Sequence, residues 1–263
     1  MTMSDFCRVS LIGLARHTSP HDNLGGMMER RDFVSFCAGA GALAATPQVL
    51  LAKANAEPRF YSRARLTDET GKLVKVSELI VNKNYLFHYP YAGTPCFLIN
   101  LDRATGQDVT LKTADGTAYL WTGGVGPGRT VVAFSAICSH KLSFPTRQHS
   151  FISFRHDKVA AAKRGDVIAC CHEGSIYDPA DGARVLGGPA PQPLAAILLE
   201  YDDKADGLTA VGTLGGETFN EFFEKYDIRL VLEYGGTGRA QRKISDTTPV
   251  TELDRFCKNQ IRC

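Results

Sequence analysis

The sequence has little of several residue types, and each scarcity excludes a class of protein. Only 8 of the 263 residues are cysteine, too few for the disulfide-dense scaffold of small secreted domains. The formal net charge is +2, and no arginine-rich or aromatic-interleaved basic stretch occurs, so nothing indicates a nucleic-acid-binding surface. The hydrophobic fraction of 44% is ordinary for a globular protein with its own core.

Residues 1–56 are interpreted as an N-terminal extension followed by an export signal. Arg30 and Arg31 precede an apolar run over residues 36–51, and a small-residue cleavage site ends at Ala56. This order is that of a secretory signal, and the paired arginines resemble a twin-arginine signal. A retained membrane anchor is the alternative, although the run is shorter than the roughly 20 apolar residues of a spanning helix. In either case we expect the body of the protein to be periplasmic.

The body of the chain, residues 57–235, is predicted to be mostly β, because short runs of Val, Ile, Tyr, Phe and Leu alternate with turn formers. The predicted strands are residues 59–66, 78–81, 85–89, 96–101, 109–112, 130–137, 196–201, 208–212 and 228–233. A helical spacing of i, i+3, i+4, i+7 is found at Phe219, Phe222, Phe223 and Tyr226. Residues 236–263 are interpreted as a polar C-terminal tail that ends in a short helix over residues 251–261.

Cysteine and histidine gather in two short blocks, Cys138-Ser139-His140 and Cys170-Cys171-His172. A thiolate and an imidazole on each of two loops form the ligand set that an iron–sulfur cluster with mixed ligation needs. A loop rich in glycine and proline follows at residues 187–194. A cysteine-nucleophile enzyme is a weaker interpretation, because adjacent residues rarely align as nucleophile and base.

These blocks resemble the Rieske iron–sulfur protein family. Its pattern is C-x-H in a first loop, C-x-x-H-G-S-x-[FY]-D in a second, and a glycine/proline loop after it. Cys138-Ser139-His140 fits the first loop, residues 174–178 fit the tail of the second, and residues 187–194 fit the third. The resemblance implies an antiparallel β-sandwich with a small cluster-binding subdomain over residues 133–194, short C-terminal helices and one [2Fe-2S] cluster.

The resemblance also implies which residues hold and cover the cluster. Cys138 and the second-loop cysteine would bind the buried iron, and His140 and the second-loop histidine would bind the outer iron. The third loop would cover the cluster and exclude water, with contacts from Gly188, Pro189 and Pro191.

Two hydroxyl groups match the hydrogen-bond donors of the family. Ser175 matches the position that donates to a bridging sulfide, and Tyr177 matches the position that donates to a cysteine sulfur. Such donors stabilise the reduced, more negative cluster and therefore raise its reduction potential.

The front of the second loop departs from the family pattern. Aligned on Gly174-Ser175, the cysteine slot falls on Cys170 and the histidine slot on Glu173, while His172 takes a slot where many members carry a disulfide cysteine. Aligned on His172, no cysteine occupies the ligand slot. Four interpretations stay open. They are Cys170 with His172 as ligands, Cys171 as a ligand in a rearranged loop, Glu173 or a water on the outer iron, and no cluster.

The remaining cysteines give weaker signals. Ser143 stands five residues after Cys138, in the first-loop disulfide slot, so the loop-to-loop disulfide of the family is expected to be absent. Cys257 and Cys263 lie near the C-terminus. In an oxidising compartment they could pair with each other, stay free or form an intermolecular bond.

The predicted function is electron transfer in a respiratory chain, not catalysis by this chain. The resemblance implies a periplasmic protein or subunit that passes electrons from a donor enzyme or quinol to a cytochrome c-like acceptor. It implies two settings, the small subunit of arsenite oxidase and the iron–sulfur subunit of a quinol–cytochrome c reductase. The weak anchor and the absent first-loop cysteine favour the former or another relative of it. The alternative is a binding or structural module that keeps the Rieske scaffold with a non-standard or absent cluster.

Overall fold

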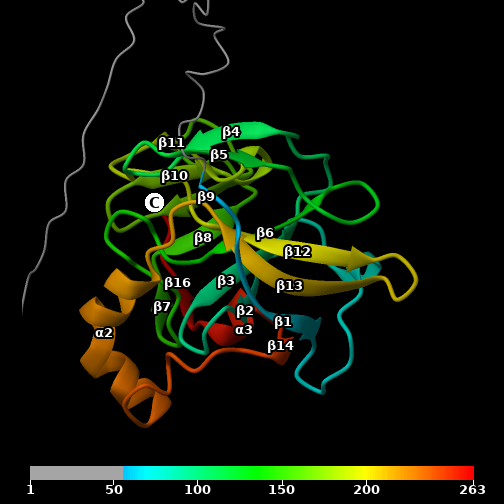
Figure 1. Ribbon diagram of the computed structural model, residues 1–263. Coiled ribbons are helices and arrows are strands. Elements are labelled where there is room, and N and C mark those ends of the chain that lie inside the picture. Colours follow the sequence, from blue (N-terminus) through cyan, green and yellow to red (C-terminus); the bar gives the residue numbers. More distant parts are fainter. Residues whose placement is uncertain (1–55) are drawn as a thin grey trace, which may run out of the picture. The chain divides into compact units, whose positions relative to one another are not determined.

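The computed structural model of the protein describes residues 56–263 (Figure 1). The predicted extension and export signal therefore lie outside the described residues, apart from Ala56. Within the described part, no helix is long and apolar enough to cross a membrane.

An eight-stranded sheet forms the larger layer, in the order β14-β1-β13-β12-β6-β3-β2-β15. Its pairs are antiparallel except that of β14 with β1, which is parallel. The bounds are β1 (Arg59–Thr67), β2 (Tyr85–His88), β3 (Pro95–Asn100), β6 (Val131–Ser135), β12 (Ala196–Asp202), β13 (Gly207–Leu214), β14 (Asp246–Pro249) and β15 (Thr251–Glu252). The predicted mostly-β antiparallel fold is confirmed.

A four-stranded antiparallel sheet forms the smaller layer, in the order β11-β10-β9-β8. It lies above the large sheet in Figure 1. Its strands are β8 (Ile152–Arg155), β9 (Val167–Cys170), β10 (Ser175–Asp178) and β11 (Arg184–Gly187). Two further pairs are the antiparallel β4 (Val109–Lys112) with β5 (Ala118–Trp121), and the parallel β7 (His149–Ser150) with β16 (Asn259–Gln260).

The main core lies between the two sheets and follows from the alternation of side chains along each strand. Phe97 and Ile99 of β3 face Phe154 of β8 and Ile168 of β9 within one buried cluster. The opposite faces of β3 and β6 pack in a second cluster with β1, which contains Leu66. Both faces of the large sheet are therefore covered, which explains why its central strands are almost continuously apolar.

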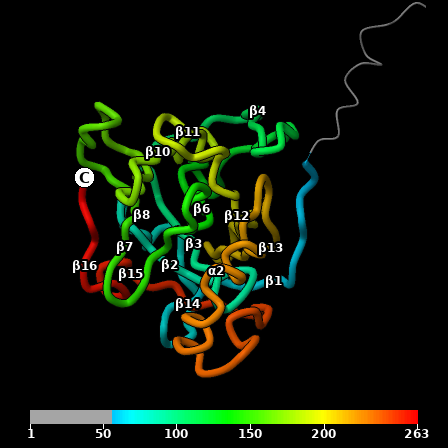
Figure 2. The backbone as a smooth tube through the Cα atoms, turned by 90° about the vertical axis from the view of Figure 1, so that its left-hand side faces the viewer, coloured from blue at the N-terminus to red at the C-terminus, as the bar shows by residue number. Residues whose placement is uncertain are grey.

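Helix α2 (Phe219–Tyr234) covers the chain that leaves β6. The predicted aromatic spacing is confirmed, because Phe219, Phe222 and Phe223 pack on Ile137 and Phe144 in a third buried cluster. Figure 2 shows α2 in front of the strands, away from the β4–β5 pair. The short elements are η1 (Val76–Glu78), η2 (Pro179–Asp181) and α3 (Leu253–Phe256).

Two predicted strands were wrong. Residues 78–81 form no strand; η1 ends there, and Ile80 and Val81 are exposed. Residues 228–233 lie inside α2, where Leu230 faces the core and Ile228 and Leu232 are each 78% exposed. The apolar side chains of residues 228–233 therefore lie on both faces of a helix. In the sequence alone their alternation with polar residues resembles that of a strand.

The C-terminal segment, which was predicted to be a polar tail, contains three strands that pair with the rest of the fold. Strand β14 pairs with β1, β15 pairs with β2, and β16 pairs with β7. The predicted helix over residues 251–261 is reduced to α3, because backbone pairing begins on both sides of it. In both views the C-terminus lies beside the smaller sheet (Figures 1 and 2).

Candidate metal centre

Strand alternation brings Cys138 and Cys170 into the main core from two different elements. The period-two pattern of β6 continues past its end, so Val132, Phe134, Ala136 and Cys138 all enter that core. Cys170 is the last residue of β9 and points to the same side. Both cysteines are 1% exposed, and each thiol is the largest single influence on the pKa of the other. The structure thus joins the two cysteines that the two sequence blocks supply.

The first loop, residues 136–148, wraps its backbone around the sulfur of Cys138. The N–H groups of His140 and Lys141 donate to that sulfur. The loop is closed by two backbone hydrogen bonds, from Cys138 N–H to Ser143 O and from Leu142 N–H to Cys138 O, each at 2.9 Å. Donors aimed at a buried sulfur stabilise a thiolate over a thiol.

The second loop, residues 171–174, is the four-residue turn of the β9–β10 hairpin. Cys170 lies directly opposite Ser175 in the strand register, and the Gly174 N–H donates to Cys170 O at 2.9 Å. Gly174 takes a φ of +77°, which glycine adopts without the steric cost of a Cβ. The N–H of His172 donates to the Cys170 sulfur, as His140 does for Cys138.

Two hydroxyl groups of β10 lie on the side of the cysteines. The Tyr177 hydroxyl is 3.3 Å from Cys138 Sγ and 3.2 Å from Ser139 Oγ. The Ser175 hydroxyl is buried and has no hydrogen-bond partner among the described protein atoms. A buried hydroxyl without a hydrogen-bond partner lowers the stability of the fold by about 1–3 kcal/mol. A bound group with an acceptor atom at this position would remove that cost.

The third loop, residues 188–195, packs directly on the second. A Cβ on Gly188 would lie 2.3 Å from Gly174 O, and its φ is +81°, so only glycine permits this approach. Ala190 packs against the main core, and Gln192 O accepts a hydrogen bond from Ser139 Oγ at 2.7 Å. Pro189 and Pro191 are exposed and form the outer surface of this cover.

The two histidines lie at the surface end of the loops but have different partners. His140 Nδ1 is 3.3 Å from Glu173 Oε2, with side-chain exposures of 23% and 42%. His172 is exposed, and its Nδ1 hydrogen-bonds Ser143 Oγ at 2.6 Å. Its ring lies against Phe151, with centroids 5.4 Å apart. The structure thus pairs His140 with Glu173, and not with His172.

Cys171 forms a disulfide with Cys263, which corrects two sequence-based alternatives. A sulfur in a disulfide is not a thiolate, so Cys171 does not serve as the ligand of a rearranged loop in this structure. Cys263 is likewise not paired with Cys257, which is a free, buried cysteine. The bond ties the second loop to the end of the chain over a separation of 92 residues.

The electrostatics of the thiols fit a ligand role. The hydrogen bond from Cys170, followed by that from Tyr177, lowers the pKa of the Cys138 thiol to about 5, although burial opposes this. The same hydrogen bond, together with burial, raises the pKa of Cys170. Burial also raises the pKa of Tyr177, so its hydroxyl stays protonated and can donate. The Cys138 thiol therefore loses its proton readily, whereas the Cys170 thiol keeps its proton.

The residues present fit a two-iron cluster of the Rieske kind. Among the described residues, no three His, Cys, Asp or Glu side chains gather around one point as ligands of a single ion. A Rieske cluster instead takes two protein ligands on each iron. Cys138 and Cys170 form a buried pair of that kind, and the partnerless hydroxyl of Ser175 offers a donor to an inorganic sulfide.

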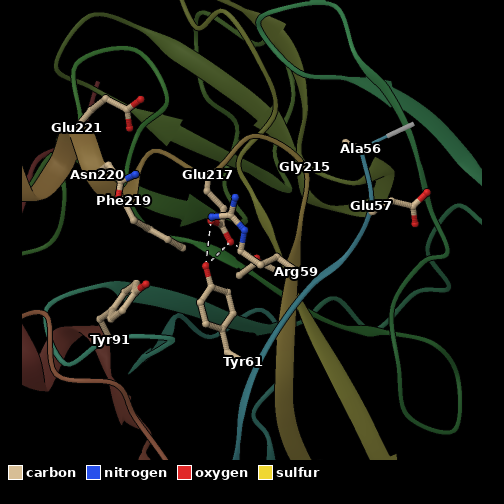
Figure 3. Close-up of a pocket in the computed structure, with 11 residues that line it drawn as sticks. Ala56, Glu57, Arg59, Tyr61, Tyr91, Gly215, Glu217, Phe219, Asn220 and Glu221 are labelled. Carbon is tan, nitrogen blue, oxygen red and sulfur yellow. Dashed lines mark hydrogen bonds and ion pairs between the residues drawn. The ribbon is translucent and has the colours of Figure 1, made fainter. Parts of the chain in front are cut away.

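A pocket of a different character lies between β1, β13 and the start of α2 (Figure 3). The Tyr61 hydroxyl lies 3.1 Å from both carboxylate oxygens of Glu217, which also pairs with Arg59. Burial raises the pKa of Tyr61 to about 12. These groups satisfy one another, and none of the predicted ligands is among the described residues that line the pocket, so it offers no alternative metal centre.

No protein-family model matches the chain. Among solved structures, the chain is similar to the soluble domain of the Rieske protein II (soxF) from Sulfolobus acidocaldarius, at 29% identity. The match covers 60% of this chain and 82% of that chain, with a TM-score of 0.40.

Sequence reasoning missed three features of the site. Ser143 hydrogen-bonds His172, Ser139 connects the first and third loops, and Cys263 reaches the second loop from the C-terminus. A signal existed for Ser143, which stands in the slot of a family disulfide. The sequence carries no comparable signal for Cys263, because the pairing depends on how the C-terminal segment runs along the sheet.

Proposed function

We propose that this chain binds a Rieske-type [2Fe-2S] cluster and transfers single electrons. The observation that carries the proposal is the pair of buried thiols of Cys138 and Cys170 in one core cluster, beside a Ser175 hydroxyl that has no partner among the described protein atoms. Cys138 and Cys170 would hold the inner iron, and His140 would bind the outer iron. When bound, such a cluster supplies one reversible electron step at a potential set by its ligands and their hydrogen bonds.

The surrounding groups would stabilise the reduced state. Reduction adds one negative charge, and the Tyr177 hydroxyl together with the N–H groups of His140 and Lys141 point at the sulfur that would share that charge. The Ser143 hydroxyl and the His172 N–H do the same for Cys170. Because donors of this kind interact more strongly with the more negative state, they raise the potential.

Electrons would enter and leave through the surface end of the site. The cysteines are enclosed by the two sheets, whereas His140 is partly exposed beside a groove that Leu142, Pro191 and Thr218 also line. A redox partner that docks at this groove comes nearest to the outer iron. The third loop, held by the Ser139–Gln192 hydrogen bond, keeps water from the buried pair.

We place the protein in the periplasm, as an electron-transfer subunit rather than a catalytic chain. The paired arginines Arg30 and Arg31 support export of a folded, cluster-bearing protein, and the Cys171–Cys263 disulfide suits an oxidising compartment. A donor enzyme or quinol would supply the electron, and a cytochrome c-like protein would accept it. These partners are part of the proposal and are inferred from the sequence resemblance.

The test is the metal content and colour of the purified full chain. We expect about two irons and two inorganic sulfides per chain, as a [2Fe-2S] cluster requires, and a red-brown protein that bleaches on reduction. The Cys138→Ser and Cys170→Ser variants should both be colourless, whereas Cys96→Ser, at a buried free cysteine hydrogen-bonded to Tyr89 O, should keep the iron. A colourless, iron-free wild type purified from iron-replete cells contradicts the proposal.

A module without a cluster is the second candidate. The observation that favours it is the Ser143–His172 hydrogen bond, which engages the histidine that the cluster pattern would have used. In that case a chelator, used without a thiol reductant so that the Cys171–Cys263 bond stays closed, should leave the free energy of unfolding unchanged, because no metal contributes to it. A lower unfolding free energy after iron removal supports the cluster.

A further inference from the structure

We infer that Glu173, and not His172, completes the ligand pair of the outer iron beside His140. The inference rests on the proposed function and gives it a specific ligand set, Cys138 and Cys170 on one iron with His140 and Glu173 on the other. It follows from the geometry of the second loop and from the partners of each side chain in it.

The hairpin fixes the position of each residue in the second loop. Cys170 and Ser175 are paired across the β9–β10 ladder, so residues 171–174 are all that connect them. The Gly174 N–H closes this turn on Cys170 O at 2.9 Å. The positions of the residues in such a closed four-residue turn cannot shift along the chain, because a shift by one residue would break the pairing of β9 with β10.

Two of the candidate side chains in that turn already have partners on other segments. Cys171 is bonded to Cys263. His172 is held by Ser143 Oγ at its Nδ1 atom and lies against Phe151. Cys171 is thereby held on the C-terminal segment, whereas His172 lies between Phe151 and Ser143 of the first loop, with its Nδ1 atom already occupied by the Ser143 hydroxyl.

Glu173 lies where a second ligand of the outer iron is needed. Its Oε2 atom is 3.3 Å from His140 Nδ1. Two ligand atoms on one tetrahedral metal, at about 2.1 Å each, are separated by about 3.4 Å, an estimate transferred from tetrahedral zinc sites. The carboxylate and the imidazole therefore already stand at the spacing of two ligands on one metal.

A carboxylate changes the charge of the site. The histidine pair of a Rieske cluster is neutral, and that neutrality raises the potential above that of clusters with four thiolates. One carboxylate restores a negative charge, so this cluster should have a lower potential than one with two histidines. Lys141 Nζ, 4.0 Å from Glu173 Oε1, offsets part of that charge. A surface ion pair between His140 and Glu173 is the simpler alternative, and it would contribute little.

The deciding experiment counts histidine nitrogens at the cluster. The full chain is produced with 15N-labelled histidine, reduced, and examined by pulsed EPR for nitrogens coupled to the iron. One strongly coupled histidine nitrogen is the expected result. Two coupled nitrogens overturn the inference but leave the proposed function intact. An iron-free wild type contradicts the proposed function itself, and the inference with it.

Two variants give an independent readout. Glu173→His should retain the cluster, show a second coupled histidine nitrogen and shift the potential upward. His172→Ala should retain the iron content and the coupled nitrogen of the wild type. If Glu173→Ala instead leaves the EPR spectrum and the potential unchanged, Glu173 is only an ion-pair partner and the inference is wrong. Circular dichroism of each variant separates loss of the cluster from loss of the fold.

Discussion

Ser143 Oγ lies 2.6 Å from His172 Nδ1 and joins the first loop to the second. These are the two slots in which the resemblance to the Rieske family leads one to look for a loop-to-loop disulfide. No disulfide joins the two loops in those slots. A disulfide is instead formed by the neighbouring residue, Cys171, with Cys263 of the C-terminal segment. The second loop is therefore fastened on two sides, by a hydrogen bond to the first loop and by a disulfide to the C-terminal segment.

The disulfide should contribute strongly to stability. It closes a loop over a separation of 92 residues, and bonds of this kind contribute about 2–4 kcal/mol. We expect Cys263→Ser to lower the free energy of unfolding by that amount in denaturant titrations. A thiol reductant should have the same effect on the wild type and no further effect on Cys263→Ser. A variant as stable as the wild type would show that the bond does not constrain the chain.

Gly188 should be intolerant of substitution, whereas its neighbour Gly187 should not. A Cβ at residue 188 would lie 2.3 Å from Gly174 O at a φ of +81°, and a Cβ at residue 187 meets nothing within 4 Å. We expect Gly188→Ala to destabilise the protein by about 1–3 kcal/mol or more and Gly187→Ala by about 1 kcal/mol or less. Equal effects of the two changes, measured by thermal unfolding, would contradict the close packing of the third loop on the second.

Ser175→Ala should separate the effects of the Ser175 hydroxyl on stability and on redox chemistry. In the iron-free protein, removal of a buried hydroxyl without a partner should be neutral or stabilising, by up to about 1–3 kcal/mol. In the iron-loaded protein the same change should lower the potential, because a donor to the cluster is lost. Thr70→Ala, at an exposed hydroxyl that hydrogen-bonds Asp68 in the turn after β1, is the redox control. An unchanged potential in Ser175→Ala would show that the hydroxyl does not contact a cluster.

His88 should make the protein less stable in mild acid. Burial, with a smaller contribution from Arg147, lowers its pKa from 6.5 to about 4, so the unfolded chain binds the proton more readily than the folded one. The stability contribution is complete above pH 6.5 and is lost progressively as the pH falls towards 4. The loss should reach up to about 3 kcal/mol. His88→Gln should flatten this part of the profile, and an equal pH slope in both proteins would refute the assignment.

The β-rich body was predictable because alternation and turn residues are local signals. The central strands, the β12–β13 hairpin and the aromatic face of α2 follow directly from such patterns. The strands of the smaller sheet carry a weaker local signal, since β8 and β9 are only four residues long and lie among histidines, serines and cysteines. The pairing of β14, β15 and β16 depends on contacts with strands far away in the sequence, which no local pattern encodes.

The candidate site was predictable in part for the same reason. Cys138 and Cys170 lie where strand alternation sends them, and Tyr177 reaches Cys138 as the resemblance implies. The partner of His140 was not decided by the sequence, because two registers of the second loop competed. The structure decides the register of the second loop, because Cys170 pairs with Ser175 across the hairpin. Glu173 then lies beside His140.

The central claim is that Cys138 and Cys170 hold one iron of a two-iron cluster. The most direct measurement is the EPR spectrum of the full chain, purified from iron-replete cells and reduced with a low-potential reductant, beside Cys138→Ser and Cys170→Ser. The account predicts the signal of a reduced [2Fe-2S] cluster in the wild type and its loss in both variants. A wild type that binds less than one iron per chain and gives no signal on reduction would contradict it.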